Sequence, residues 1–119
     1  MKESYKFQKL DVYKLALDYV KAIYSLRKNL PDRERFNLVS QIERAATSIV
    51  LNIAEGSTGQ SNPEQKRFLG LALRSYLETI ACLDLIEHLG YLSENEIKPL
   101  REQGHQLFVK LSAFRRALK

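Results

Sequence analysis

The stretch RAATSIVLNIAEG, residues 44–56, decides the fold prediction. Its apolar residues recur every three or four positions, which is the spacing of one face of an α-helix. Arg44, Ser48, Asn52 and Glu55 recur at similar spacing beside that apolar face. The segment is therefore predicted as a helix that carries a polar stripe next to its core-facing side.

The same helical periodicity extends along the chain and is interrupted at three places. The interruptions are NLPDRERF (29–36), GSTGQSNPEQ (56–65) and HLGYLSENEIKP (88–99), which are rich in turn and helix-end residues. No stretch alternates apolar and polar residues as a strand would. Long helices joined by short loops favour antiparallel neighbours. We therefore predict that residues 1–119 form a single all-α domain, an antiparallel up-and-down four-helix bundle.

The helix ends carry their own signals. The expected segments are residues 9–30, 34–55, 63–89 and a last helix that begins with a distorted turn near 93 or starts near 98. Gly56 suits a left-handed residue that closes the second helix. Asn62 with Pro63 suits the start of the third, and Ser93 with Glu96 resembles a capping box.

Composition and cysteine usage exclude several classes of protein. The 119 residues include one cysteine, Cys82, which lies among apolar residues and is predicted to be a buried core residue. The N-terminus has lysines and no apolar signal-peptide segment, and no apolar run is long enough to span a bilayer. We expect a cytoplasmic protein without membrane association.

The residues offer little support for catalysis. His88 and His105 belong to no metal-binding spacing, and Ser48 and Ser75 have no histidine partner in the local sequence. The GSTGQS loop lacks the Gly-Lys-Ser/Thr ending of a phosphate-binding P-loop. We therefore expect a non-enzymatic protein without a cofactor or a metal.

The polar stripe has three interpretations: an interhelical network, a site for a ligand or nucleic acid, and a solvated face. Charged groups beside a core are costly unless they are paired, and the third helix offers partners, with Arg44 opposite Glu78. We favour a structural polar network, whose members are Arg44, Ser48, Asn52, Glu55, Ser75 and Glu78.

The net charge of +5 is unevenly distributed along the chain. Residues 1–35 hold nine Lys/Arg against five Asp/Glu, residues 36–97 hold four against eight, and residues 98–119 hold six against one. Basic terminal helices attract phosphate, although they also occur as ordinary solvated surface. The candidate nucleic-acid-binding residues are Lys14, Lys21, Arg27, Lys28, Lys110, Arg115, Arg116 and Lys119. Without a base-reading motif, RNA or DNA binding would be sequence-tolerant.

QIERAATSIVLNIAEGS, followed by KRFLGLALRSYLETIACLDLIEHLGYL, resembles the family of 23S rRNA-intervening sequence proteins. The resemblance rests on an Arg-Ala-Ala-x-Ser-Ile-x-x-Asn-Ile-Ala-Glu-Gly run over residues 44–56, on Phe68, Leu69, Ala72, Ser75 and Glu78, and on the early FQKLDVYKLA. Arg74 stands where the family often has glycine.

The resemblance implies a four-helix bundle that assembles as a ring-like homopentamer, with no established activity for most members. Some members are encoded inside sequences that interrupt the large ribosomal RNA gene. A related branch serves diversity-generating retroelements as an accessory protein that binds a reverse transcriptase and nucleic acid.

Two classes of function follow. The first is an oligomeric module that associates with nucleic acid or with a protein partner such as a reverse transcriptase. The second is a purely structural assembly protein whose polar stripe only specifies packing. Both predict a homo-oligomer, because the first and third helices carry apolar residues on more faces than a lone bundle buries.

Overall fold

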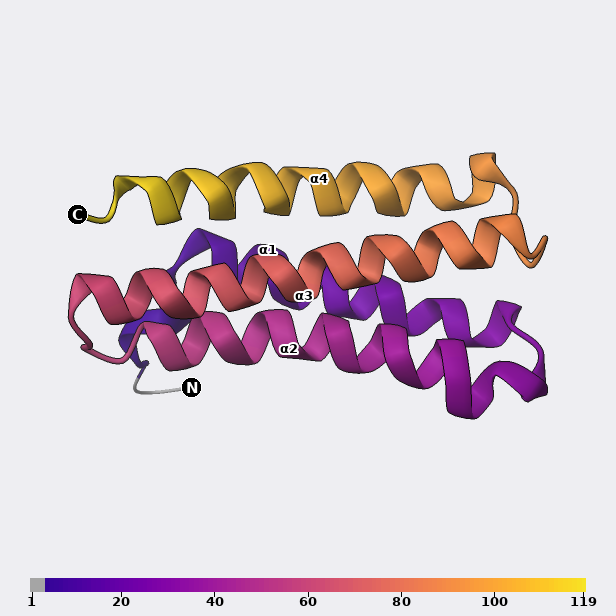
Figure 1. Ribbon diagram of the computed structural model, residues 1–119, viewed down its shortest axis with the longest axis horizontal. Coiled ribbons are helices and arrows are strands. Elements are labelled where there is room, and N and C mark those ends of the chain that lie inside the picture. Colours follow the sequence, from indigo (N-terminus) through magenta and orange to yellow (C-terminus); the bar gives the residue numbers. More distant parts are fainter. Residues whose placement is uncertain (1–3) are drawn as a thin grey trace.

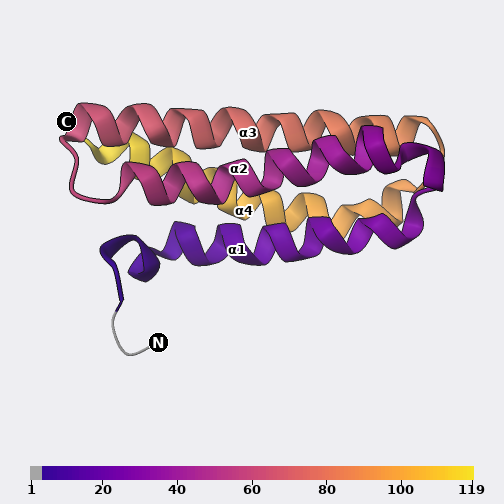
Figure 2. The ribbon, with the colours of Figure 1, turned by 90° about the horizontal axis from the view of Figure 1, so that it is seen from below.

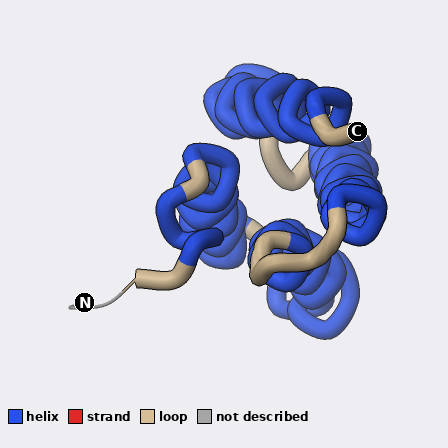
Figure 3. The backbone as a smooth tube through the Cα atoms, turned by 90° about the vertical axis from the view of Figure 1, so that its left-hand side faces the viewer, coloured by secondary structure: helices blue, strands red, loops and turns tan. Residues whose placement is uncertain are grey.

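The computed structural model describes residues 4–119 as four helices packed side by side. The helices are α1 (Asp11–Tyr24), α2 (Ser40–Gly56), α3 (Asn62–His88) and α4 (Glu94–Ala117). Each packs against the next, and α4 returns to pack against α1 (Figure 1; Figure 3). The described residues contain no strand. The predicted antiparallel up-and-down four-helix bundle is confirmed.

The apolar stripe of α2 faces the centre of the bundle. Ile42, Ala45, Ile49 and Ile53 are all buried, as is Leu38 just before α2, as their spacing predicts. Together with buried residues of the other three helices they form a common core. Burial of this stripe is the main reason that the segment adopts a helix in the folded protein.

The connection between α1 and α2 is itself mostly helical. A 3-10 helix, Ser25–Asn29, extends α1, and a wide π-turn, Arg35–Val39, leads into α2. The Glu34 carboxylate accepts hydrogen bonds from Asn37 Nδ2 at 3.1 Å and from Tyr91 Oη at 2.7 Å. The contact to Tyr91 ties this connection to the turn between α3 and α4. The helices predicted over 9–30 and 34–55 are therefore present, but their outer turns are not α-helical.

Gly56 is the last residue of α2, and the expectation that it closes the helix in a left-handed conformation is wrong. Its φ is not positive; Gly59 and Gly90 are the described glycines with positive φ. A Cβ on Gly56 would lie 2.5 Å from Phe68 Cβ of α3. Glycine is required there because α2 and α3 approach too closely for any side chain.

The starts of α3 and α4 are capped by serines. Ser61, not Asn62, is the N-cap of α3, and Pro63 lies within its first turn. Ser93 and Glu96 form the predicted capping box. The last helix therefore begins at Glu94 and includes Pro99, because the capping box satisfies its first amides. Gly90, with φ 81°, terminates α3.

Tyr19, Tyr76 and Gly104 pack together in the middle of the bundle. Thr79 Oγ1 donates to Tyr76 O at 2.6 Å, so Tyr19 Oη donates to Thr79 Oγ1 at 2.8 Å. Burial raises the pKa of the Tyr19 hydroxyl above its ordinary value. A Cβ on Gly104 of α4 would lie 2.8 Å from the Tyr19 ring. Glycine at this position lets α4 lie against both tyrosines.

Candidate functional site

The polar stripe of α2 contacts α3 through a pair of serines. Ser75 Oγ donates to Ser48 Oγ at 2.9 Å. Asn52 Nδ2 donates to Ser48 O at 2.9 Å and to Ser48 Oγ at 3.0 Å. All three residues are half-buried. The structure thus brings Ser48, Asn52 and Ser75 together at the junction of the two helices.

The charged members of the stripe lie apart from this contact. Arg44 is exposed and donates to Ser40 Oγ on its own helix at 3.2 Å. Glu55 and Glu78 are also exposed, and within residues 4–119 no ion pair joins Arg44 to Glu78. The expected Arg44–Glu78 pair is therefore absent from the protomer. Both charged side chains stay hydrated, because the free energy of hydration exceeds the small stabilisation that an exposed ion pair would give.

An open polar groove of about 380 Å³ follows the α2–α3 junction. Ser48, Asn52 and Ser75 line it together with Leu71, Arg74 and Glu78. Arg74 is exposed at the rim of this groove. The groove therefore carries hydroxyl and amide groups with charges of both signs at its edge.

The predicted basic residues divide between two ends of the bundle. Because α1 and α4 are antiparallel, the start of α1 lies beside the end of α4, and one groove is lined by both. Lys14, Lys110, Arg115, Arg116 and Lys119 belong to this end, which also contains the end of α2 and the start of α3 (Figure 1). We call it the basic end. The eight candidate basic residues of the sequence analysis therefore do not all lie at one end of the bundle.

The other three predicted residues, Lys21, Arg27 and Lys28, lie at the opposite end among carboxylates. Arg27 Nε and Nη2 donate to Glu43 at 3.1 and 2.5 Å. These bonds raise the pKa of the Arg27 guanidinium above its ordinary value. Lys28 lines a groove that also contains Glu96. We call this the mixed end, because its charges largely cancel.

Residue counts make the difference between the ends explicit. The described basic end holds nine basic residues, Lys6, Lys9, Lys14, Lys66, Arg67, Lys110, Arg115, Arg116 and Lys119, against three acidic ones, Asp11, Glu55 and Glu64. The mixed end holds eight basic residues, Lys21, Arg27, Lys28, Arg33, Arg35, Arg44, Lys98 and Arg101, against eight acidic ones, Asp32, Glu34, Glu43, Asp84, Glu87, Glu94, Glu96 and Glu102. Positive charge is thus concentrated at one end of the bundle.

Four basic-end residues were not among the sequence candidates: Lys6, Lys9, Lys66 and Arg67. Lys66 and Arg67 belong to the acidic middle of the sequence, so a count by segments concealed them. The predicted antiparallel topology could have located these residues, because it sets the start of α3 beside the end of α4. Figure 2 shows that the 3-10 turn Lys6–Lys9, before α1, lies at the same end as the C-terminus.

Arg115 is fixed within the basic end. Its Nε donates to Lys66 O at 3.0 Å. A Cβ on Gly70 would lie 3.2 Å from Arg115 Nε and Nη2, so the guanidinium crosses α3 at a notch left by that glycine. Arg115 therefore holds the end of α4 to α3, in addition to adding charge.

The cysteine and the two histidines lie in different surroundings. Cys82 is buried as predicted, and burial raises the pKa of its thiol. His105 is exposed and packs on Phe108 with ring centroids 6.4 Å apart. His88 is exposed in a groove with Arg101. Within the described residues, no three His, Cys, Asp or Glu side chains are placed to hold a metal ion, and no helix is long and apolar enough to cross a bilayer.

The fold, the polar α2–α3 junction and the basic end together define the class of protein, a small antiparallel four-helix bundle. The chain belongs to the 23S rRNA-intervening sequence protein family, whose family model matches residues 8–113. The resemblance stated from the sequence is therefore confirmed at the level of the family.

Solved structures extend this similarity to three dimensions. One is a Bacteroides thetaiotaomicron protein, described as having unknown function and as coming from the S23 ribosomal protein family. It is 25% identical, superposes with a TM-score of 0.80, and the match covers 88% of this chain and 95% of that one. No curated protein sequence matches the chain. The link to retroelement accessory proteins stays a prediction.

Proposed function

We propose that this protein is a non-enzymatic, homo-oligomeric module of the cytoplasm that binds nucleic acid through its basic end. The observation that carries the proposal is the charge at that end, nine basic residues against three acidic ones. Clustered lysine and arginine side chains bind the phosphate backbone by releasing condensed counterions. The mixed end lacks this excess, so binding is expected at one end only.

The basic end combines mobile and fixed cations. Lys14, Lys110 and Arg116 are exposed on helix surfaces and can follow phosphates of varied geometry. Arg115 is held in place by the Lys66 carbonyl, so less side-chain freedom is lost when its guanidinium meets an anion. Such contacts position a backbone without identifying bases. The binding is therefore proposed to be sequence-tolerant and steeply dependent on salt.

Association of several copies would repeat the basic end. Leu17 on α1, Leu51 on α2 and Leu77 on α3 are each about half exposed, at 45%, 56% and 53%. Covering them against other copies would stabilise a domain of this size. Family membership favours a pentamer. A ring would then present several weak phosphate contacts at once, which raises the overall affinity through effective concentration. A protein partner such as a reverse transcriptase would bind such an assembly together with its nucleic acid.

A titration with matched charge reversals tests the proposal. Labelled RNA and DNA would be titrated at two salt concentrations with wild type, with Lys110→Glu/Arg116→Glu, and with Lys21→Glu/Lys98→Glu. The two variants change the net charge equally, but the first changes the basic end and the second the mixed end. We expect the basic-end variant to bind more weakly and to lower the salt slope by roughly 1.5 to 2, because two phosphate contacts are lost.

Two outcomes would contradict the proposal. Equal effects of the two variants would show that net charge, and not the basic end, governs binding. Failure of wild type to bind either nucleic acid at low salt would favour the purely structural alternative, in which the bundle acts only as an assembly unit.

A further inference from the structure

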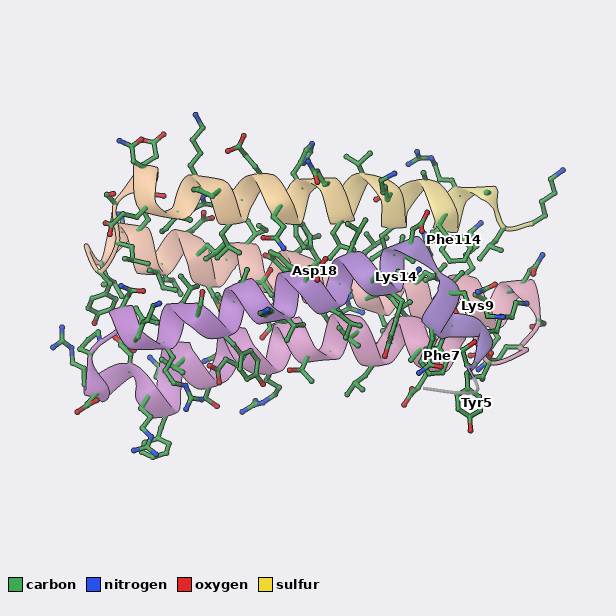
Figure 4. The ribbon with its side chains drawn as sticks, turned by 180° about the vertical axis from the view of Figure 1, so that it is seen from behind. Tyr5, Phe7, Lys9, Lys14, Asp18 and Phe114 are labelled. Atoms are coloured by element: carbon green, nitrogen blue, oxygen red, sulfur yellow. The ribbon has the colours of Figure 1, made fainter. Side chains whose placement is uncertain are left out.

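An open groove lies between the start of α1 and the end of α4, at the basic end. Its volume is about 290 Å³, and its lining consists of Leu10, Asp11, Val12, Lys110, Ala113 and Phe114. Figure 4 shows Phe114 at this end of the bundle together with Lys9 and Lys14. The groove is therefore a mainly apolar recess with Lys110 and Asp11 in its lining and with Lys9 and Lys14 at the same end of the bundle.

Helix periodicity places the cations at the edges of this recess. Lys14 follows Asp11, a lining residue of the recess, by three residues, so both lie on one face of α1. On α4, Lys110 precedes Phe114 by four residues. Leu10 and Phe114 are half-buried, whereas Lys14 and Lys110 are exposed. Apolar surface thus lies between an amine from each helix.

We propose that this groove holds one unpaired base of a single-stranded nucleic acid, while adjacent phosphates bind Lys9, Lys14 and Lys110. The inference rests on the proposed function and adds the class of nucleic acid. A base has apolar faces that pack on an aromatic ring and on aliphatic side chains, and such stacking tolerates any sequence. Lys14 on α1 and Lys110 on α4 are exposed and supply cations for the flanking phosphates.

Asp11 decides which part of the nucleotide enters. Asp11 is an exposed residue of the lining, and its negative charge would repel a phosphate there. The same carboxylate accepts hydrogen bonds from the amino group of a base edge. With a base in the groove and the phosphates outside it, the Asp11 carboxylate meets the base and the lysine amines meet the phosphates. The bases of a duplex are stacked inside the helix and cannot reach the groove, so a duplex would bind the lysines alone.

The test compares three labelled probes of one mixed sequence: a single-stranded RNA, its duplex, and a single strand with abasic sites in place of its bases. Ala113→Phe fills the groove without changing charge, at a position that is already exposed. Phe114→Leu removes the ring and retains an apolar side chain. Ala81→Phe makes the same substitution at an exposed position of α3 outside the basic end. Sedimentation would confirm that all variants keep the assembly of wild type.

We expect Ala113→Phe and Phe114→Leu to weaken single-strand binding by roughly fivefold to a hundredfold, which is the range for loss of one stacked base. Binding of the duplex and of the abasic strand should change by less than twofold in the same proteins, and Ala81→Phe should match wild type with every probe. Retained binding of the abasic strand also shows that the variants are folded.

The outcomes separate this inference from the proposed function. Unchanged single-strand affinity in both groove variants, with salt-dependent binding of all probes, would overturn base insertion and leave the charged interface standing. Equal losses for all three probes would overturn it as well, since the groove would then act on backbone binding. Binding of an acidic polypeptide such as polyglutamate, with no binding of any nucleic acid, would overturn both.

Discussion

Gly56 lies where the end of α2 meets the start of α3, and an alanine there has no space. The added Cβ would stand 2.5 Å from Phe68 Cβ, whereas ordinary contacts begin at 3.4 Å. Phe68 Cβ is bonded directly to the backbone, so it cannot move without α3. The two helices would have to separate by about 1 Å, which disturbs the packing along their contact.

The expected cost follows from two opposing effects. Overpacking a close contact costs about 1–3 kcal/mol. Alanine gains at most ~1 kcal/mol over glycine inside a helix, and less at the last helical residue. We therefore predict that Gly56→Ala lowers the free energy of unfolding by about 2 kcal/mol, equivalent to a fall in Tm of roughly 8 °C.

Urea unfolding followed by circular dichroism measures this difference, at a fixed protomer concentration because association adds stability. Gly70→Ala is the matched control. There the nearest atoms, Nε and Nη2 of Arg115 at 3.2 Å, would need to move by only a few tenths of an ångström. Its free energy of unfolding should stay within about 0.5 kcal/mol of wild type or rise. A Gly56→Ala protein as stable as wild type would refute the close-approach argument.

Three further predictions follow from the contacts. A double-mutant cycle with Ser48→Ala and Ser75→Ala should give a coupling of about 0.5–1.5 kcal/mol, and additive effects would show that the hydroxyl contact contributes nothing. The hydrogen bond from Tyr91 is the main cause of the lowered pKa of Glu34 in the folded protein. The ionised Glu34 carboxylate therefore contributes its full stabilisation of the folded state above the ordinary pKa of 4.5, and this contribution is lost as the pH falls through the lower pKa of the folded protein. Tyr91→Phe should therefore reduce the loss of stability on acidification, and an unchanged acid limb of the stability curve would contradict this. Sedimentation equilibrium should give a mass several times the 13.8 kDa protomer, and a clean monomer would contradict assembly.

Helix periodicity and breaks were sufficient to predict the fold. The apolar spacing of Ile42, Ile49 and Ile53 identified the buried face of α2, and Pro31 marked the first connection. These features are local, since a residue four positions away is a neighbour in any helix. The π-turn Arg35–Val39 was missed because it continues the apolar pattern and changes only the hydrogen bonding.

Features that depend on neighbouring helices were predicted less well. The spacing of Arg44 placed it beside the core, yet the distance to Glu78 depends on how α2 and α3 pack, and both side chains remain in water. Gly56 illustrates the same limit, because the position of Phe68 decides its role. The basic end appears only after antiparallel packing sets the start of α3 beside the end of α4. A charge count along the sequence divides Lys66 from Arg116 and hides their common location.

Lysine footprinting tests the central claim most directly. Acetylation of the assembled protein would be followed by mass spectrometry with and without a single-stranded RNA, which reports each amine separately. RNA is expected to protect the basic-end amines, namely Lys6, Lys9, Lys14, Lys66, Lys110 and Lys119. Reactivity at the mixed end, at Lys21, Lys28 and Lys98, is expected to stay unchanged. Protection at the mixed end, or equal protection at both ends, would contradict binding at the basic end.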